Sequence, residues 1–398
     1  MRTWAVVLLL LLIPTVSSYL VETQEIILQE HNVKFPAVSS PSLSILPNGS
    51  LFAVFSEVTY GGIYGKMSND NGLVWTEPFQ IKSSDDSFKA YSNFLIISEN
   101  QTMLFYSRLV NSSDLSLWKI ESFDNGQSWI SDTRVDTGTH SYVCTGTNGL
   151  RMRNGTLIVP IAWDGNCSIL RSDDKGRSWF ESQAIRMGDN WNTTLDEPAI
   201  VELGNSSLYC LFRTYGYKRH FSALSNDYGL SWTEALPVEE LWSFNTTPAL
   251  YECSNHVIIV AWINRSAGID AYQRRPLAVA ISLDDCNSWH QSRIIDNGIL
   301  DNEGRRIDPR SRFSMNEPVI IVSKHTLIVG YRRYNDDKTK TPPTSDGVTR
   351  ILPLNLFATA ELISLTFGTN NPCADLNLDG AVNIFDSILF GTRQISSS

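Results

Sequence analysis

Short apolar segments, each divided by a polar turn, recur along most of the chain. Six of these segments superpose without gaps, and each contains an apolar strand, a turn and a second apolar strand. This alternation is typical of β-hairpins. The turns are centred on Asn48, Gln101, Asn154, Asn205, Asn255 and His325. The pattern therefore predicts six hairpins and an all-β protein.

A second pattern, Ser-x-Asp-x-Gly-x-x-Trp, lies between the hairpins. Its copies begin at Ser68, Ser122, Ser172, Ser225 and Ser282, with separations of 54, 50, 53 and 57 residues. A period of about 50 residues is typical of β-propeller blades. In each copy we expect the Asp to cap its own backbone and the Gly to take a positive φ. The fifth copy has Cys286 in place of Gly, so we expect that turn to be degenerate.

Six hairpins and five such turns predict a six-bladed β-propeller whose last blade lacks the turn. We expect a strand from residues 21–32 or from residues 352–362 to close the ring. The two ends of the chain have another character. Residues 1–18 combine a basic residue, an apolar run and small residues, which is typical of a secretory signal peptide. The propeller is expected over residues 19–362.

Residues 363–398 contain a candidate calcium loop. Oxygen-bearing side chains occupy positions 1, 3, 5, 9 and 12 of an EF-hand-type loop, with Gly380 at position 6 for the sharp turn. The candidate ligands are Asp375, Asn377, Asp379, Asn383 and Asp386. The loop resembles a dockerin repeat, although dockerins normally carry two. The resemblance implies a structural Ca²⁺ ion and a cohesin-like scaffold as partner.

Composition narrows the possible functions. The net charge of −10 argues against a nucleic-acid partner, and no stretch after the signal peptide is long enough to span a membrane. The six cysteines form no CxxC pair, which argues against zinc. Export permits disulfides, and Cys144–Cys167 or Cys253–Cys286 would each staple one blade. Nine Asn-x-Ser/Thr sequons fit an exported protein; they begin at Asn48, Asn100, Asn111, Asn154, Asn166, Asn192, Asn205, Asn245 and Asn264.

The candidate site lies where the innermost strands begin, around the central axis. The six superposed segments place Ser40, Asn93, Gly146, Glu197, Thr247 and Glu317 in equivalent positions. Pairing across the hairpins puts Arg213 opposite Glu197 and Arg333 opposite Glu317. These pairs could be salt bridges that keep a polar channel soluble. Alternatively, the two carboxylates flank a glycosidic bond, one as acid and the other as nucleophile or base.

Residues 34–335 resemble the sialidase (neuraminidase) superfamily, through the Asp turns and the segment EPAIVELGNSSLYCLFR. The resemblance implies a Glu that polarises a nucleophilic Tyr, three arginines that bind the sialate carboxylate, and an Asp as acid/base. Glu197 matches the family Glu and Arg213 matches one of the arginines. Arg275 matches a further arginine, and Arg274 matches it nearly as well.

Three departures from the family pattern change the expected chemistry. Ser39 replaces the first arginine, residues 57–64 contain no Asp, and Glu317 occupies the position of the Tyr. A Glu nucleophile suits a neutral sugar better, as in exo-arabinanases, which share this propeller and use two glutamates. We therefore expect a secreted glycoside hydrolase that acts on a glycan through Glu197 and Glu317, with Arg213, Arg275 and Arg333 as substrate-binding residues. Asp164 could supply a missing acid. A non-catalytic carbohydrate-binding propeller and a true exo-α-sialidase with a rearranged site are the alternatives.

Overall fold

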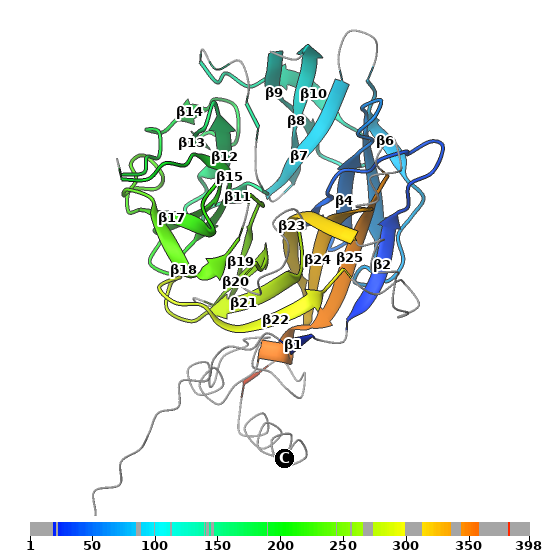
Figure 1. The fold of residues 1–398 in the computed structure, drawn as a ribbon. Helices are drawn as coiled ribbons and strands as arrows, with labels where there is room; N and C mark the ends of the chain where they lie inside the picture. The colour runs from blue at the N-terminus through cyan, green and yellow to red at the C-terminus, as the bar shows by residue number, and fades with distance from the viewer. Residues whose placement is uncertain are drawn as a thin grey trace, which may run out of the picture.

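The computed structural model describes residues 19–20, 23–84, 89–98, 100–111, 114–138, 140, 143–144, 147–188, 190–243, 245–254, 257–265, 274–298, 313–335, 344–357 and 381–382. Six sheets surround a central axis (Figure 1). Within the described ranges the helical content is one 3₁₀ turn, η1 (Leu354–Phe357). The predicted all-β, six-bladed architecture is confirmed. The candidate signal peptide and the five candidate calcium ligands lie outside the described residues.

The first three blades follow each other in the chain, with their strands numbered from the channel outward (Figure 1). Blade one contains β3 (Ser42–Ile45), β4 (Leu51–Ser56), β5 (Ile63–Ser68) and β6 (Phe79–Lys82). Blade two contains β7 (Lys89–Ser98), β8 (Gln101–Asn111), β9 (Asp114–Ser122) and β10 (Ile130–Arg134). Blade three contains β11 (Leu150–Arg151), β12 (Leu157–Trp163), β13 (Asn166–Ser172) and β14 (Phe180–Glu181).

The last three blades complete the ring. Blade four contains β15 (Leu195–Glu202), β16 (Leu208–Thr214), β17 (Arg219–Ser225) and β18 (Leu236–Trp242). Blade five contains β19 (Ala249–Ser254), β20 (Val257–Ile263), β21 (Leu277–Ser282) and β22 (His290–Asp296). Blade six contains β23 (Phe313–Ser323), β24 (Thr326–Asn335) and β25 (Ser345–Pro353), and a strand from the other end of the chain.

That strand is β2 (Gln24–Gln29), which pairs antiparallel with β25 and closes the ring. The short β1 (Tyr19–Leu20) pairs with β22 in parallel. Of the two segments considered from the sequence, residues 21–32 supply the closing strand. Glu25 on β2 accepts a hydrogen bond from Arg333 at 2.8 Å and forms an ion pair with Arg350. Because these side chains are largely buried, the charge pairs fix β2 against blade six.

The Asp turns have the expected geometry. In the second copy, the Asp124 carboxylate accepts the backbone N–H of Ser128 at 2.9 Å, and Gly126 has φ 78°. The Trp129 indole donates to the Gly126 carbonyl at 3.1 Å, so the ring packs under its own turn.

The fifth turn is not degenerate, contrary to the sequence-based expectation. Asp284 accepts the Ser288 N–H at 2.9 Å, and the Cys286 N–H donates to the Ser282 hydroxyl at 2.9 Å. Cys286 adopts φ 66°, which is a left-handed conformation normally reserved for glycine. The hydrogen bonds therefore keep the turn in place at a cost in backbone strain of order 1 kcal/mol.

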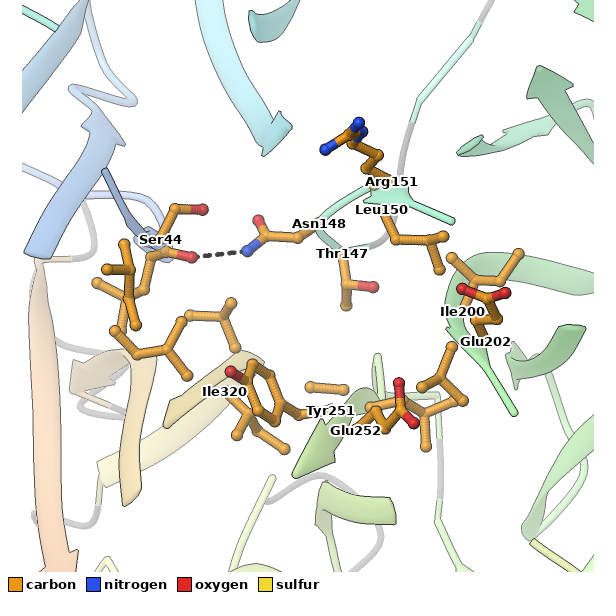
Figure 2. Close-up of a pocket in the computed structure, with 18 residues that line it drawn as sticks. Ser44, Thr147, Asn148, Leu150, Arg151, Ile200, Glu202, Tyr251, Glu252 and Ile320 are labelled. Atoms are coloured by element: carbon orange, nitrogen blue, oxygen red, sulfur yellow. Dashed lines mark hydrogen bonds between the residues drawn. The ribbon is translucent and has the colours of Figure 1, made fainter. Parts of the chain in front are cut away.

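The central channel contains a cavity of about 350 Å³ (Figure 2). Innermost strands of several blades line it, including residues 200–202 of β15 and 319–321 of β23. Asn148 donates to the Leu43 carbonyl at 2.7 Å, which joins blades three and one beside the cavity. The channel is thus walled by the same strands that carry the candidate site.

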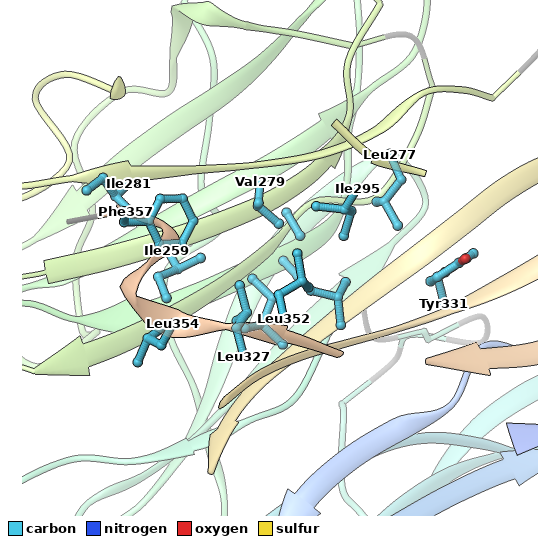
Figure 3. Close-up of a cluster of buried hydrophobic side chains, with 14 of the residues drawn as sticks. Ile259, Leu277, Val279, Ile281, Ile295, Leu327, Tyr331, Leu352, Leu354 and Phe357 are labelled. Carbon is cyan, nitrogen blue, oxygen red and sulfur yellow. The ribbon is translucent and has the colours of Figure 1, made fainter. Parts of the chain in front are cut away.

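Apolar layers between neighbouring blades form the core. The layer between blades five and six includes Ile259, Val279 and Leu327, and Leu354 and Phe357 of η1 pack on it (Figure 3). Val382, at position 8 of the candidate calcium loop, is fully buried in the same layer. The described part of the C-terminal segment is therefore packed on the propeller.

Two further expectations concern cysteines and membranes. The structure gives Cys144, Cys167 and Cys286 free thiols, so neither disulfide considered from the sequence is formed. Across the described ranges, no helix has the length and apolar character needed to span a bilayer.

Candidate active site

Glu197 and Glu317 occupy equivalent β-bulges in the first half of the innermost strands of blades four and six. In β15 the pairing register shifts by one residue between Asp196 and Ala199, and in β23 it shifts between Asn316 and Val319. A proline follows each glutamate and cannot donate a ladder hydrogen bond, which favours a bulge there. Glu197 has φ 38° and Glu317 has φ 48°. Non-glycine residues adopt such angles rarely, and this strain is typical of functional positions.

Glu197 is held by an arginine and a hydroxyl group. The Arg213 guanidinium donates to Oε2 of Glu197 at 2.5 Å, and the Thr247 hydroxyl donates to the same oxygen. Arg213 is only 8% exposed and is itself oriented by a hydrogen bond to the Asn245 side chain at 2.8 Å. Because this ion pair is shielded from water, the negative charge on Glu197 is well compensated. The structure thus contains a contact between Arg213 and Glu197, but the residue directly opposite Arg213 on the neighbouring strand is Asp196 and not, as predicted, Glu197.

Glu317 has a different electrostatic environment. Burial raises its pKa, and the nearby Glu197 carboxylate raises it further, whereas Arg332, a hydrogen bond from Ser40 and Arg274 oppose the shift. The Asn316 amide donates to Oε1 of Glu317 at 2.7 Å. The two glutamates are therefore close enough to interact electrostatically. One is paired with a cation, while the other is biased towards its protonated form.

Asp196, which the sequence analysis did not single out, lies directly beside this pair. The Tyr215 hydroxyl donates to its carboxylate at 2.8 Å, and the Glu197 N–H donates to its other oxygen at 2.9 Å. Burial raises the pKa of Asp196, and the Glu197 charge adds to the effect. Burial and the Asp196 carboxylate raise the pKa of Tyr215 to about 12. The one sequence signal for Asp196 is its place immediately before the Glu-Pro bulge.

The predicted pairing of Arg333 with Glu317 is wrong. Arg333 lies opposite Met315, and its 4% exposed side chain contacts Glu25 on β2. Its neighbour Arg332 is the residue on this strand whose charge acts on Glu317. The sequence reasoning therefore chose the wrong member of an Arg-Arg pair.

The error has a geometric cause. The β23–β24 hairpin closes through the pair Ser323 and Thr326, so its turn contains two residues and is centred between Lys324 and His325, not on His325. A one-residue change of register moves each side chain to the opposite face of a sheet. In blade four, Glu202 pairs with Leu208 and the turn is centred on Asn205 as expected. With the turn centred as expected, Arg213 reaches Glu197, although the bulge in β15 makes Asp196 its cross-strand partner.

The remaining candidates are placed as follows. Arg275 is 2% exposed, and the adjacent Arg274 is the residue whose charge acts on Glu317. The Met315 N–H donates to the Arg274 carbonyl at 2.8 Å, which holds this segment beside β23. Asp164 is exposed in the turn between β12 and β13.

In blade one, Ser39 and Glu57 have structural roles. The Ser39 hydroxyl accepts the Ser56 N–H at 2.9 Å and so has a backbone-pairing role where the family carries an arginine. Glu57 is 2% exposed, and its carboxylate accepts the N–H groups of Thr59, at 2.8 Å, and Tyr60. Glu57 therefore stabilises a turn rather than extending towards the channel.

The channel cavity lies deeper along the axis than the carboxylate pair. Its lining residues follow Glu197 and Glu317 by two to five positions, at about 3.3 Å per residue. Glu202 and Glu252 are among the residues that line it (Figure 2). In the described part of the chain, no group of three or more His, Cys, Asp or Glu side chains is arranged to hold a metal ion.

Comparison with known proteins identifies the family. Residues 62–329 match the model of the BNR repeat-like domain, so the chain belongs to this family of repeat propellers. No curated protein matches it in sequence.

Solved structures agree with this assignment at the level of fold. The NanB sialidase of Streptococcus pneumoniae has a TM-score of 0.65 and 14% identity, over 83% of this chain and 70% of that one. The Trypanosoma rangeli sialidase in complex with 2,3-difluorosialic acid has a TM-score of 0.64 and 14% identity, over 84% and 59%. A Dyadobacter fermentans protein of unknown function has a TM-score of 0.64 and 14% identity, over 83% and 98%. The fold is thus that of sialidases.

Proposed function

We propose that the protein is a secreted glycoside hydrolase in which Glu317 is the general acid and Glu197 is the nucleophile or base. The observation that carries this proposal is the pair of equivalent strained bulges at one end of the channel: one carries a carboxylate paired with Arg213, and the other carries a carboxyl group whose pKa is raised by burial. A glycosidase needs one protonated and one ionised carboxyl group across the scissile bond. The sialidase fold of the structural neighbours supports the same class of reaction.

The proposed chemistry follows from the two environments. Glu317 transfers its proton to the glycosidic oxygen as the bond to the anomeric carbon breaks. Glu197 either forms the new bond to that carbon, in a retaining enzyme, or removes a proton from the attacking water, in an inverting one. Arg213 and Thr247 hold the Glu197 carboxylate in position.

Separate Glu197→Gln and Glu317→Gln variants test the proposal on a panel of neutral, pectic, sulfated and sialylated glycans. Each substitution should lower kcat by at least about 10²-fold. Glu202→Gln is the matched control, because Glu202 is a buried glutamate of the same strand that binds Arg153. No turnover by the parent chain on any substrate, together with measurable glycan binding, would favour the non-catalytic propeller instead.

A true sialidase is the second candidate, supported by a specific observation. Arg332 and Arg274 both act electrostatically on Glu317, and Arg213 contacts Glu197. Three guanidinium groups near one site suit a carboxylated sugar even though Ser39 replaces the family arginine. Release of 4-methylumbelliferone from its sialoside, and not from neutral glycosides, would select this candidate.

The two ends of the chain complete the proposal. Residues 1–18 direct export, and the loop at residues 375–386 binds Ca²⁺ through carboxylate and amide oxygens, which suit this ion. Burial of Val382 supports a structural role for the ion in holding the tail on blades five and six. A cohesin-like scaffold is the proposed partner. We expect EDTA to lower the melting temperature of the parent chain and not that of an Asp375→Ala/Asp379→Ala variant.

A further inference from the structure

A groove of about 550 Å³ lies between blades two and three. Turns at the far ends of the innermost strands line it, including Asn100 and Asn154, and the Asp turns contribute Phe123 and Lys175. Glu197 lies at the other end of its innermost strand. The groove is therefore on the face of the propeller opposite the candidate active site.

Phe123 is the unusual feature of this groove. Its side chain is 58% exposed, although it stands between the Ser and the Asp of a turn and a polar residue fills that position in the first, third and fourth copies. An exposed aromatic ring surrounded by polar groups indicates a ligand site, because the ring and the polar groups together can bind an amphipathic ligand. Asn69 and Asp173 hold the equivalent position in copies one and three.

Several polar groups beside the ring are available to a ligand. Asn100, Asn154 and Lys175 are exposed. The side-chain amide oxygen of Asn154 (Oδ1) accepts the Thr156 N–H at 2.9 Å, which leaves the side-chain NH₂ group for another acceptor. Asp173, by contrast, is engaged by Arg171 at 2.7 Å. The groove therefore offers mainly hydrogen-bond donors around one apolar surface.

We propose that this groove is a non-catalytic binding site for a pyranose sugar. The apolar C–H face of a pyranose can stack on the Phe123 ring, while its hydroxyl groups accept hydrogen bonds from Asn100, Asn154 and Lys175. A volume of about 550 Å³ falls within the range of small-molecule sites and accommodates one or two sugar rings. Binding in this groove does not require a glycan in the candidate active site on the opposite face.

The sugar has two possible sources with the same chemistry. Asn100 and Asn154 each begin an Asn-x-Thr sequon, so the ligand is either a free oligosaccharide or the first sugars of an N-linked chain. In the second case the Asn Nδ2 forms a bond to the anomeric carbon of a polyprenyl-diphosphate oligosaccharide, the diphosphate leaves, and the amide proton is lost to a base.

The test uses the whole chain from a bacterial host, without N-glycans, and N,N′-diacetylchitobiose and 3′-sialyllactose as probes. Saturation-transfer NMR titration should show binding that Phe123→Ala weakens at least about fivefold, the scale expected for loss of one stacking contact. Phe180→Ala is the matched control, since Phe180 is 61% exposed and does not line the groove. Both rings are on the surface, so neither change should impair folding.

Two results would overturn the proposal: no binding of either probe, or equal binding by the parent chain and Phe123→Ala. The second arm identifies the source of the sugar. Chain from a eukaryotic secretory host is analysed by mass spectrometry at Asn100 and Asn154 and titrated before and after endoglycosidase treatment. Probe binding that appears only after treatment identifies the N-linked chain as the occupant, whereas equal binding before and after identifies a free glycan.

Discussion

Replacing His220 by Asn should make the fold markedly less sensitive to acid. His220 lies on β17 and is fully buried. Its Nδ1 is 3.1 Å from the Phe212 carbonyl, which can only accept, so Nδ1 carries the proton. The other ring nitrogen, Nε2, is buried without a hydrogen-bond partner. A second proton at Nε2 would therefore create an uncompensated charge inside blade four.

Burial lowers the pKa of His220 to about 4, from 6.5 in an unfolded chain. Between these two values the unfolded state binds a proton that the folded state does not, so stability falls as the pH falls from 6.5 towards 4. Above pH 6.5 the imidazole is neutral in both states and contributes no pH dependence. Each pH unit in the window corresponds to about 1.4 kcal/mol, and the whole window therefore to about 3 kcal/mol.

The assay is urea denaturation of the parent chain and the variant at several pH values from 7.5 to 4.5. Asn can keep the donor to Phe212 through its Nδ2, and it does not titrate. The variant should lose about 2–3 kcal/mol less stability over this range than the parent. His290→Asn is the matched histidine replacement at an exposed position. A difference below about 1 kcal/mol between parent and His220→Asn would refute the reasoning.

Two other predictions concern named charges. Arg332→Met removes a cation that lowers the pKa of Glu317. Because Glu317 must be protonated to act, the alkaline limb of the pH–rate profile should move to higher pH. Arg333→Met is the control and should leave that limb in place; an unmoved limb in both variants would contradict the assignment of Arg332. Glu25→Gln breaks the buried pairs with Arg333 and Arg350 and should lower the free energy of unfolding by about 3 kcal/mol, as measured by chemical denaturation. Unchanged stability of that variant would mean that the charges do not fix β2.

Much of the fold could be predicted from the sequence because its signals are local. Each Asp turn and each hairpin lies within a few residues, so spacing alone gave the six blades. The arginine that faces each glutamate, in contrast, depends on the length of the hairpin turn, and a difference of one residue changes it. The sequence could not show that Ser323 and Thr326 close a two-residue turn. Without this register, Arg333 was predicted as the partner of Glu317 in place of Arg332.

Two other outcomes depended on interactions that sequence patterns do not reveal. The role of Asp196 became visible through its contact with Tyr215, which directly follows the next strand, β16. Cys286 keeps a turn intact in spite of its positive φ, because the hydrogen bonds of Ser282 and Asp284 outweigh the local strain. A missing glycine alone was therefore a poor guide to a degenerate turn.

The closing strand has a consequence for biosynthesis. Gln24 pairs with Ile351, so β2 has its partner only after the more than 300 residues that separate the two strands have been synthesised. Until then blade six lacks its outer edge, and β2 is an unprotected strand on a nascent polypeptide. Closure of the propeller ring by β2 must be a late, long-range event, and chaperones that shield β2 until then should increase the yield of native protein.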